Sequence, residues 1–131
     1  AAEGVVVDYD RVRHGNSRRA HELVHEAKAQ GRQDEMVERL MRAHFAEGRH
    51  LGHIDELVDL AAEVGLHPLQ TRTALESGMH AAAVADDIER SVFFRIRALP
   101  FLLIGPRFGV SGAHEPAYYA EVIAKSAAAA D

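Results

Sequence analysis

The chain has 131 residues, a formal net charge of −5 and neither cysteine nor tryptophan. A chain of this length suits one domain with a sizeable core, and the hydrophobic fraction of 47% is ordinary for a folded protein. The acidic balance argues against nucleic acid as a partner, because phosphate binding needs a basic surface. No apolar run approaches the ~20 residues of a membrane span. The lack of cysteine excludes disulfides, thiolate metal sites and a cysteine nucleophile within this sequence.

The first predicted element is a strand over residues 4–10, where β-branched valines alternate with other side chains. Asn16 or Ser17 is then expected to cap a helix, because a short side-chain oxygen can accept hydrogen bonds from the first helical turn. Apolar residues recur at helical spacing through the next part of the chain. They predict helices over residues 17–30, 34–47, 54–64, 68–77 and 79–93.

The pattern changes towards the C-terminus. A nearly continuous apolar run over residues 98–104 predicts a strand that is covered on both faces, and a turn and a short returning strand over 108–111 follow. Pro116 opens a final helix that runs to about Ala127. Strands on both sides of a helical block indicate an α/β or α+β fold, with residues 1–131 as one domain.

A formal metal-binding pattern lies in the first predicted helix. The segment HELVH, with His21, Glu22 and His25, matches H-E-x-x-H, which places two imidazoles one helical turn apart. The extended form of this motif fails, because Lys28 and Gly31 stand where it needs glycine and histidine. A glutamate from the next helix, Glu35, Glu38 or Glu47, could still supply a third ligand. We therefore rank a zinc hydrolase using His21, Glu22 and His25 below capping and packing roles, and we expect no metal.

Several short segments together point to a known family. They are ALPFLLI at residues 98–104, RFGVSGAH at 107–114, DRV at 10–12, GNS at 15–17 and AH at 20–21. In this combination they resemble the DsbA-like branch of the thioredoxin superfamily. The nearest likeness is to the FrnE-type cytoplasmic oxidoreductases, which are related to 2-hydroxychromene-2-carboxylate isomerases and to kappa-class glutathione transferases.

The resemblance implies an incomplete thioredoxin-like α/β fold. Residues 1–31 and 94–131 would form the thioredoxin-like portion, with a strand, a β-hairpin that begins at a cis-proline, and a C-terminal helix. Residues 32–93 would be a helical insertion. Pro100 would be the cis-proline, and the backbone of Leu99 before it would face a thiol substrate or glutathione.

Three further residues receive roles from the same resemblance. Asn16 would lie near the thiol site. Ser111 and Gly112 would match the loop that holds the γ-glutamyl end of glutathione in the glutathione-using relatives. His114 departs from the family pattern, which has glutamine at this position.

The strand and helix that carry C-x-x-C in this family have no counterpart here. That helix end lowers the pKa of the thiol and so creates the nucleophile. We therefore expect the chain to be a redox-inactive C-terminal portion of a DsbA/FrnE-like thiol–disulfide oxidoreductase. It would hold no cofactor itself, although the intact protein could use glutathione.

The missing strand is also expected to lie centrally in the sheet, and its loss exposes strand edges that recruit another chain. We therefore expect a homodimer or a completing chain segment. The family likeness implies a cytoplasmic location, and we expect no membrane or nucleic acid partner. The alternative from another class is a non-catalytic, strand-exchanged dimer or binding module.

Overall fold

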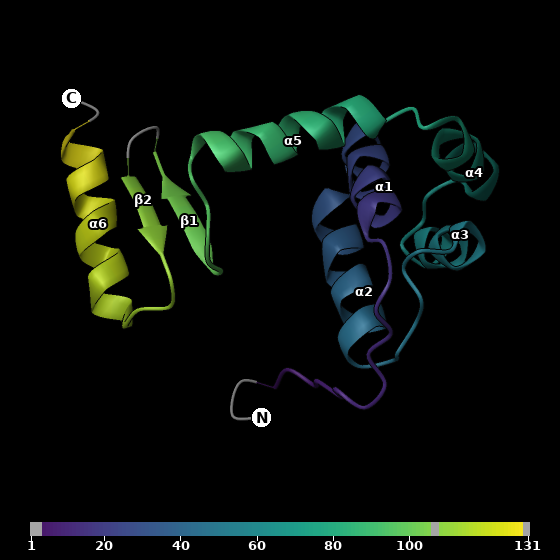
Figure 1. The fold of residues 1–131 in the computed structure, drawn as a ribbon, viewed down its shortest axis with the longest axis horizontal. Helices are drawn as coiled ribbons and strands as arrows, with labels where there is room; N and C mark the ends of the chain where they lie inside the picture. The colour runs from purple at the N-terminus through teal and green to yellow at the C-terminus, as the bar shows by residue number, and fades with distance from the viewer. Residues whose placement is uncertain (1–3, 106–107, 130–131) are drawn as a thin grey trace. The chain divides into compact units, whose positions relative to one another are not determined.

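The structure is a computed structural model that describes residues 4–105 and 108–129 (Figure 1). The chain divides into two compact units, Ala1–Asp86 and Asp87–Asp131. The boundary falls inside one helix, α5 (Ala81–Phe93). The predicted division into a thioredoxin-like portion and a helical insertion stays a prediction. It rests on family likeness, and the two compact units do not test it.

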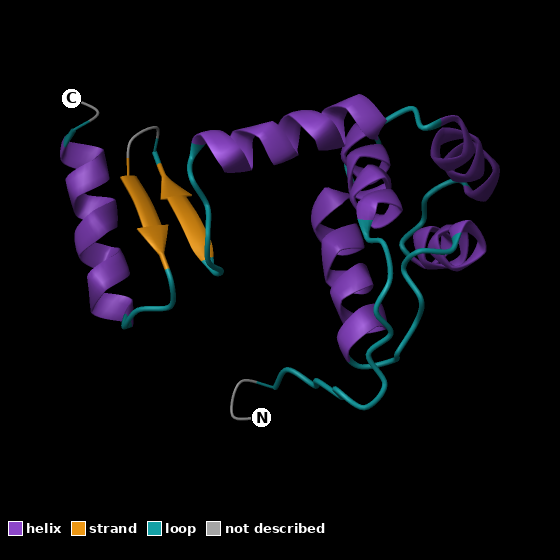
Figure 2. Cartoon of the chain, in the orientation of Figure 1, coloured by secondary structure: helices purple, strands orange, loops and turns teal. Residues whose placement is uncertain are grey.

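The first unit is built from helices (Figure 2). They are α1 (Arg18–Ala29), α2 (Gln33–Phe45), α3 (Ile54–Glu63), α4 (Pro68–Ser77) and the beginning of α5. α1 packs against α2, α3 and α4, and α3 packs against α4. The helices that the apolar spacing predicted are therefore confirmed, with ends that differ by two residues at most.

The core of the first unit is formed by aliphatic side chains from several helices. Leu23, Met36, Leu57 and Leu60 are fully buried. Burying one side chain of this size stabilises a fold by roughly 1.5–3 kcal/mol relative to leaving it exposed. The helical unit therefore has a hydrophobic core of its own.

A buried arginine joins the end of α2 to the end of α3. The Arg39 guanidinium donates two hydrogen bonds to Glu47, at 3.1 and 2.9 Å, and its Nε donates to Glu63 Oε2 at 2.6 Å. The hydrogen bond from Arg39 holds the pKa of Glu63 below its ordinary value, and the opposite charge of Arg39 adds to this effect. Arg39 is thus both buried and paired, as a charge inside a protein must be.

The strand predicted over residues 4–10 does not form. Asp8 N–H donates to the carbonyl oxygen of Phe45 at 2.7 Å, and Arg11 N–H donates to the carbonyl oxygen of Asp8 at 3.1 Å. The valines of this segment are exposed. A strand needs a neighbouring strand to pair its backbone groups, and among the described residues none lies beside this segment. Alternating valines were therefore not enough to predict a strand.

The second unit contains a β-hairpin and a helix. Its elements, besides the end of α5, are β1 (Phe101–Ile104), β2 (Phe108–Ser111) and α6 (Pro116–Ala128). The two strands are antiparallel, with Phe101 opposite Ser111. α6 packs on the hairpin, and the Ser126 hydroxyl donates to the carbonyl oxygen of Ile104 at 3.4 Å.

The expectation that β1 is covered on both faces is wrong. Leu102 is 41% exposed and Leu103 is 40% exposed, and successive strand residues face opposite sides of a sheet. Among the described residues of this unit, the buried apolar side chains are Val110 of β2 and Val122 of α6. One helix does not cover both faces of the hairpin, so apolar side chains of β1 remain in contact with solvent.

Candidate functional site at one end of the hairpin

The hairpin residues singled out by the family likeness lie together at one end of the hairpin. Leu99 and Pro100 lead into β1 and are joined by a cis peptide bond. Ser111 ends β2, and the N–H of Gly112 donates to the carbonyl oxygen of Pro100 at 2.8 Å. The Leu99 side chain is exposed. The entry and the exit of the hairpin are therefore tied by their backbones, and the Leu99 side chain beside them is in contact with solvent.

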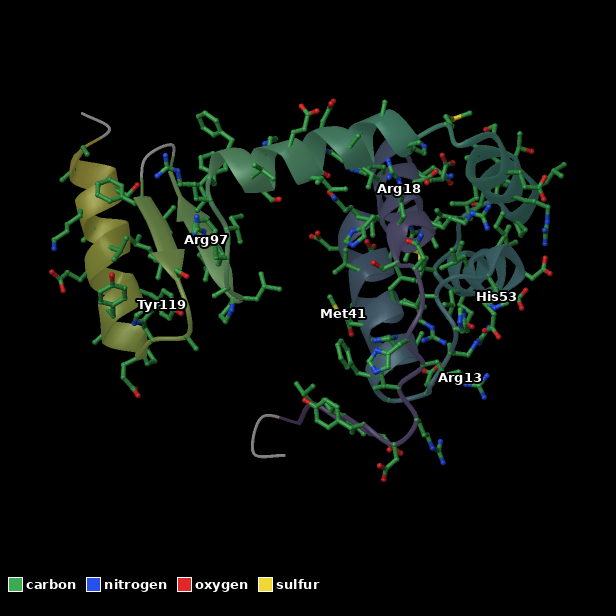
Figure 3. All side chains as sticks on the ribbon, viewed as in Figure 1. Arg13, Arg18, Met41, His53, Arg97 and Tyr119 are labelled. Atoms are coloured by element: carbon green, nitrogen blue, oxygen red, sulfur yellow. The ribbon has the colours of Figure 1, made fainter. Side chains whose placement is uncertain are left out.

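Two aromatic rings fix the loop that follows β2. His114 Nε2 lies 2.9 Å from the carbonyl oxygen of Ser111. The Tyr119 hydroxyl donates to the carbonyl oxygen of Gly112 at 3.2 Å and accepts from the N–H of His114 at 3.1 Å. Figure 3 labels Tyr119 on α6. The sequence predicted a helix here, but nothing in its pattern indicated the hydrogen bonds of Tyr119 to the loop.

Gly112 adopts a backbone angle that other residues rarely take. Its φ is +85°, in the left-handed region that favours glycine. The turn that brings its N–H onto Pro100 therefore depends on the absence of a side chain. The loop is shaped by its glycine and held by His114 and Tyr119.

Asn16 belongs to the first unit. Its Oδ1 accepts a hydrogen bond from the N–H of Arg18 at 2.9 Å, so its side chain helps to cap α1. Ser17 occupies the N-cap position but makes no side-chain cap hydrogen bond. The N-cap is therefore Ser17, one of the two predicted residues, and the hydrogen bond to the first turn comes from Asn16. The place of Asn16 near a thiol remains a prediction.

A cavity of about 310 Å³ opens between α1 and α2, within the first unit. The apolar part of its lining comprises Ala20, Val24, Val37, Leu40, Met41, Phe45 and Leu51. Its polar side chains are Arg13, Ser17, His21 and His44. Sequence reasoning missed this cavity, because most of these residues looked like ordinary core positions of two helices.

Two glycines complete the cavity and pack against a histidine. A Cβ atom added to Gly15 would lie 2.8 Å from the His50 ring, and one added to Gly52 would lie 2.9 Å from it. The His50 Nδ1 also accepts a hydrogen bond from the N–H of Gly52 at 3.1 Å. His50 is therefore a packed side chain that holds the loop before α3.

The three residues of the zinc hypothesis lie in different surroundings. His21 is exposed and lines the cavity, whereas Glu22 is buried. His25 stacks on His80 with ring centroids 6.3 Å apart, and His80 Nε2 lies 2.8 Å from the buried Glu26. Within residues 4–105 and 108–129, no group of three or more metal-binding side chains is arranged to hold an ion. The motif therefore gathers no third ligand here.

The two-stranded hairpin, the helix that packs on it and the preceding helices form part of a thioredoxin-type α/β fold, as two comparisons with known proteins show. The profile of the DSBA-like thioredoxin domain matches residues 1–124. The chain belongs to this family.

A solved structure supports the same assignment. The chain is similar to a probable DsbA oxidoreductase from Streptomyces coelicolor, with 27% sequence identity and a TM-score of 0.87. The match covers 95% of this chain and 54% of that one, so the chain spans about half the length of this relative. The search of curated protein sequences found no match.

Among the described helices, none combines the length and the apolar character that crossing a bilayer requires.

Proposed function

We propose that this chain is the C-terminal portion of a FrnE-type, cytoplasmic thiol–disulfide oxidoreductase. The observation that carries the proposal is the hairpin whose β1 leucines are exposed, in a chain that spans 54% of a related oxidoreductase. In a complete thioredoxin-type sheet, further strands and helices would bury such side chains. The chain alone has no cysteine and so supplies no thiolate nucleophile.

The role of this portion would be to bind and orient the substrate. Leu99 would present its backbone to a thiol or disulfide compound, beside Pro100 and close to Gly112. Ser111 and Gly112 would add polar contacts, including contacts to glutathione in an intact protein that uses it. The thiolate would come from a separate strand and helix that carry C-x-x-C, where the helix N-terminus lowers the pKa of the attacking cysteine.

The completing segment would pair with the free edge of β1. Within the described part of the chain, β1 pairs with β2 on one edge and with no strand on the other. An unpaired edge with apolar side chains is a template for another strand. A strand of a redox segment fits this edge, and the second candidate is the same edge of another copy of this chain.

A chimera tests the proposed function. A thioredoxin strand–helix unit with C-x-x-C is fused before residue 4, and reduction of insulin disulfides is measured. We expect activity in the chimera and none in the chain alone. In the chimera, Gly112→Val should reduce the rate because φ is +85° there, whereas Gly31→Val, at φ +69° in the first unit, should not.

A folded but inactive chimera, or insulin reduction by the unfused chain, would contradict the proposal. The strand-exchanged dimer is examined separately by the solution mass of the unfused chain. A stable dimer that is abolished by a lysine at Leu103 would favour this second candidate. A lysine at Leu69, which is exposed on α4, is the matched control.

A further inference from the structure

The cavity between α1 and α2 has a lining that selects one class of ligand. Most of its side chains are aliphatic, and they are joined by one thioether and one aromatic ring. Met41, which Figure 3 labels on α2, is 56% exposed although it lines the cavity. The cavity is therefore open to solvent at this point and is not a sealed defect of the core. An apolar ligand body gains free energy by displacing water from such a surface.

The charge around the cavity has one sign. The chain has a net charge of −5, yet neither aspartate nor glutamate lines the cavity. Arg13 lines it and makes no ion pair with any residue in 4–105 or 108–129. Arg13 is an exposed residue and the one arginine of the lining. An anionic group is therefore favoured beside Arg13.

The neighbouring imidazoles add hydrogen-bonding capacity to the same lining. His21 and His44 both line the cavity. Imidazole nitrogens can donate or accept hydrogen bonds. Ser17 supplies a hydroxyl nearby. Polar groups are thus few and distinct from the aliphatic wall, as in sites that orient a small ligand.

The volume of the cavity suits a small ligand. It is about 310 Å³, at the lower end of the range for sites that bind small molecules. We propose that this cavity binds a medium-chain aliphatic monocarboxylate, with the carboxylate at Arg13 and the alkyl chain along Val37 and Met41. The site lies wholly in the first unit, and the binding test below uses the chain without a redox segment.

The methionines of the chain provide internal probes for this site. The chain has three methionines: Met41 lines the cavity, Met36 is fully buried in the core, and Met79 is exposed elsewhere. The protein labelled at the methionine methyl groups is titrated with octanoate and followed by NMR. We expect a saturable shift of the Met41 signal, with the Met36 and Met79 signals largely unchanged.

Matched ligands and variants separate the contribution of the ligand's carboxylate to binding from the contribution of its alkyl chain. Octanol and octylamine should bind at least several-fold more weakly than octanoate, and acetate should give no shift. Arg13→Gln should weaken octanoate binding several-fold and leave octanol binding unchanged. Arg97→Gln is the control, because this substitution removes the same charge at a residue that does not line the cavity (Figure 3).

Three results would overturn the proposal. One is a titration in which octanoate shifts no methionine, or shifts all three alike. Another is equal affinity for octanoate and octanol in the unmodified chain. The last is a Met41 signal that depends on protein concentration and not on octanoate, since a second copy would then occupy the cavity.

Discussion

The two compact units bury their apolar side chains to very different extents. In the first unit, one cluster of twelve buried apolar residues joins several helices. In the second, the buried apolar side chains among the described residues are Val110 and Val122. Because hydrophobic stabilisation scales with the area removed from water, the first unit can hold its fold by itself. The second unit needs further cover over the hairpin.

The largest expected effect is the loss of stability when a side chain in the core of the first unit is truncated. Leu57→Ala removes a fully buried side chain and should lower the free energy of unfolding by about 2–5 kcal/mol. Leu69→Ala, at an exposed position of α4, should change it by less than about 0.5 kcal/mol. Urea denaturation followed by circular dichroism measures both. Similar losses in the two variants would show that the core described for this unit is wrong.

A glycine pair measures how tightly the N-terminal segment is held to the first unit. Gly48 has φ +68°, and an added Cβ would lie 2.5 Å from the carbonyl oxygen of Arg11. Gly31 has φ +69° but open space around it. Gly31→Ala should therefore cost about 1–2 kcal/mol for the left-handed backbone alone, and Gly48→Ala should cost distinctly more. Equal costs would mean that residues near Arg11 are free to move away.

The ion pair between Arg39 and Glu63 gives a smaller, pH-dependent effect. Arg39 lowers the pKa of Glu63, whose ordinary value is 4.5. The contribution is therefore fully present above pH 4.5 and is lost as the pH falls through the lower pKa of the folded state.

The side chain of Glu63 is 46% exposed, so we expect about 1 kcal/mol or less. Urea titrations at several pH values should show a smaller loss of stability below pH 4.5 in Glu63→Gln than in the unmodified chain. Parallel curves for the two proteins would exclude this contribution.

The smallest effect is expected on the uncovered hairpin. Leu103 is 40% exposed, so Leu103→Thr should change the stability of this chain by less than about 0.5 kcal/mol. In the chimera with a redox segment, the same substitution should be costly, because the side chain would then be buried. Thermal unfolding of the chain alone and of the chimera, each with and without the substitution, measures the two effects. An equal effect in both would argue against a completing strand beside β1.

The helices could be predicted from the sequence because their signals are local. The apolar spacing of α2 and the proline at the start of α4 are legible within a dozen residues. The strand over residues 4–10 could not be predicted in the same way, because pairing depends on a neighbour elsewhere in the chain. The prediction that β1 is covered on both faces failed because burial also depends on elements elsewhere in the chain.

The candidate site was predictable only in part. Leu99, Pro100, Ser111 and Gly112 were found through family likeness, and the hairpin register then brings them together. The hydrogen bond from Tyr119 to Gly112 joins a helix to a loop, and no spacing rule indicates such a contact. The cavity near Arg13 likewise needs the tertiary packing of two helices before it exists.

Hydrogen exchange of the backbone amides tests the contrast between the two units most directly. The account predicts strong protection in α1, α2 and α3, and weak protection in β1 and β2, because few apolar contacts hold the hairpin. In the chimera with a redox segment, the amides of β1 should become protected. Equal protection of the hairpin and the helices in the chain alone would contradict the account.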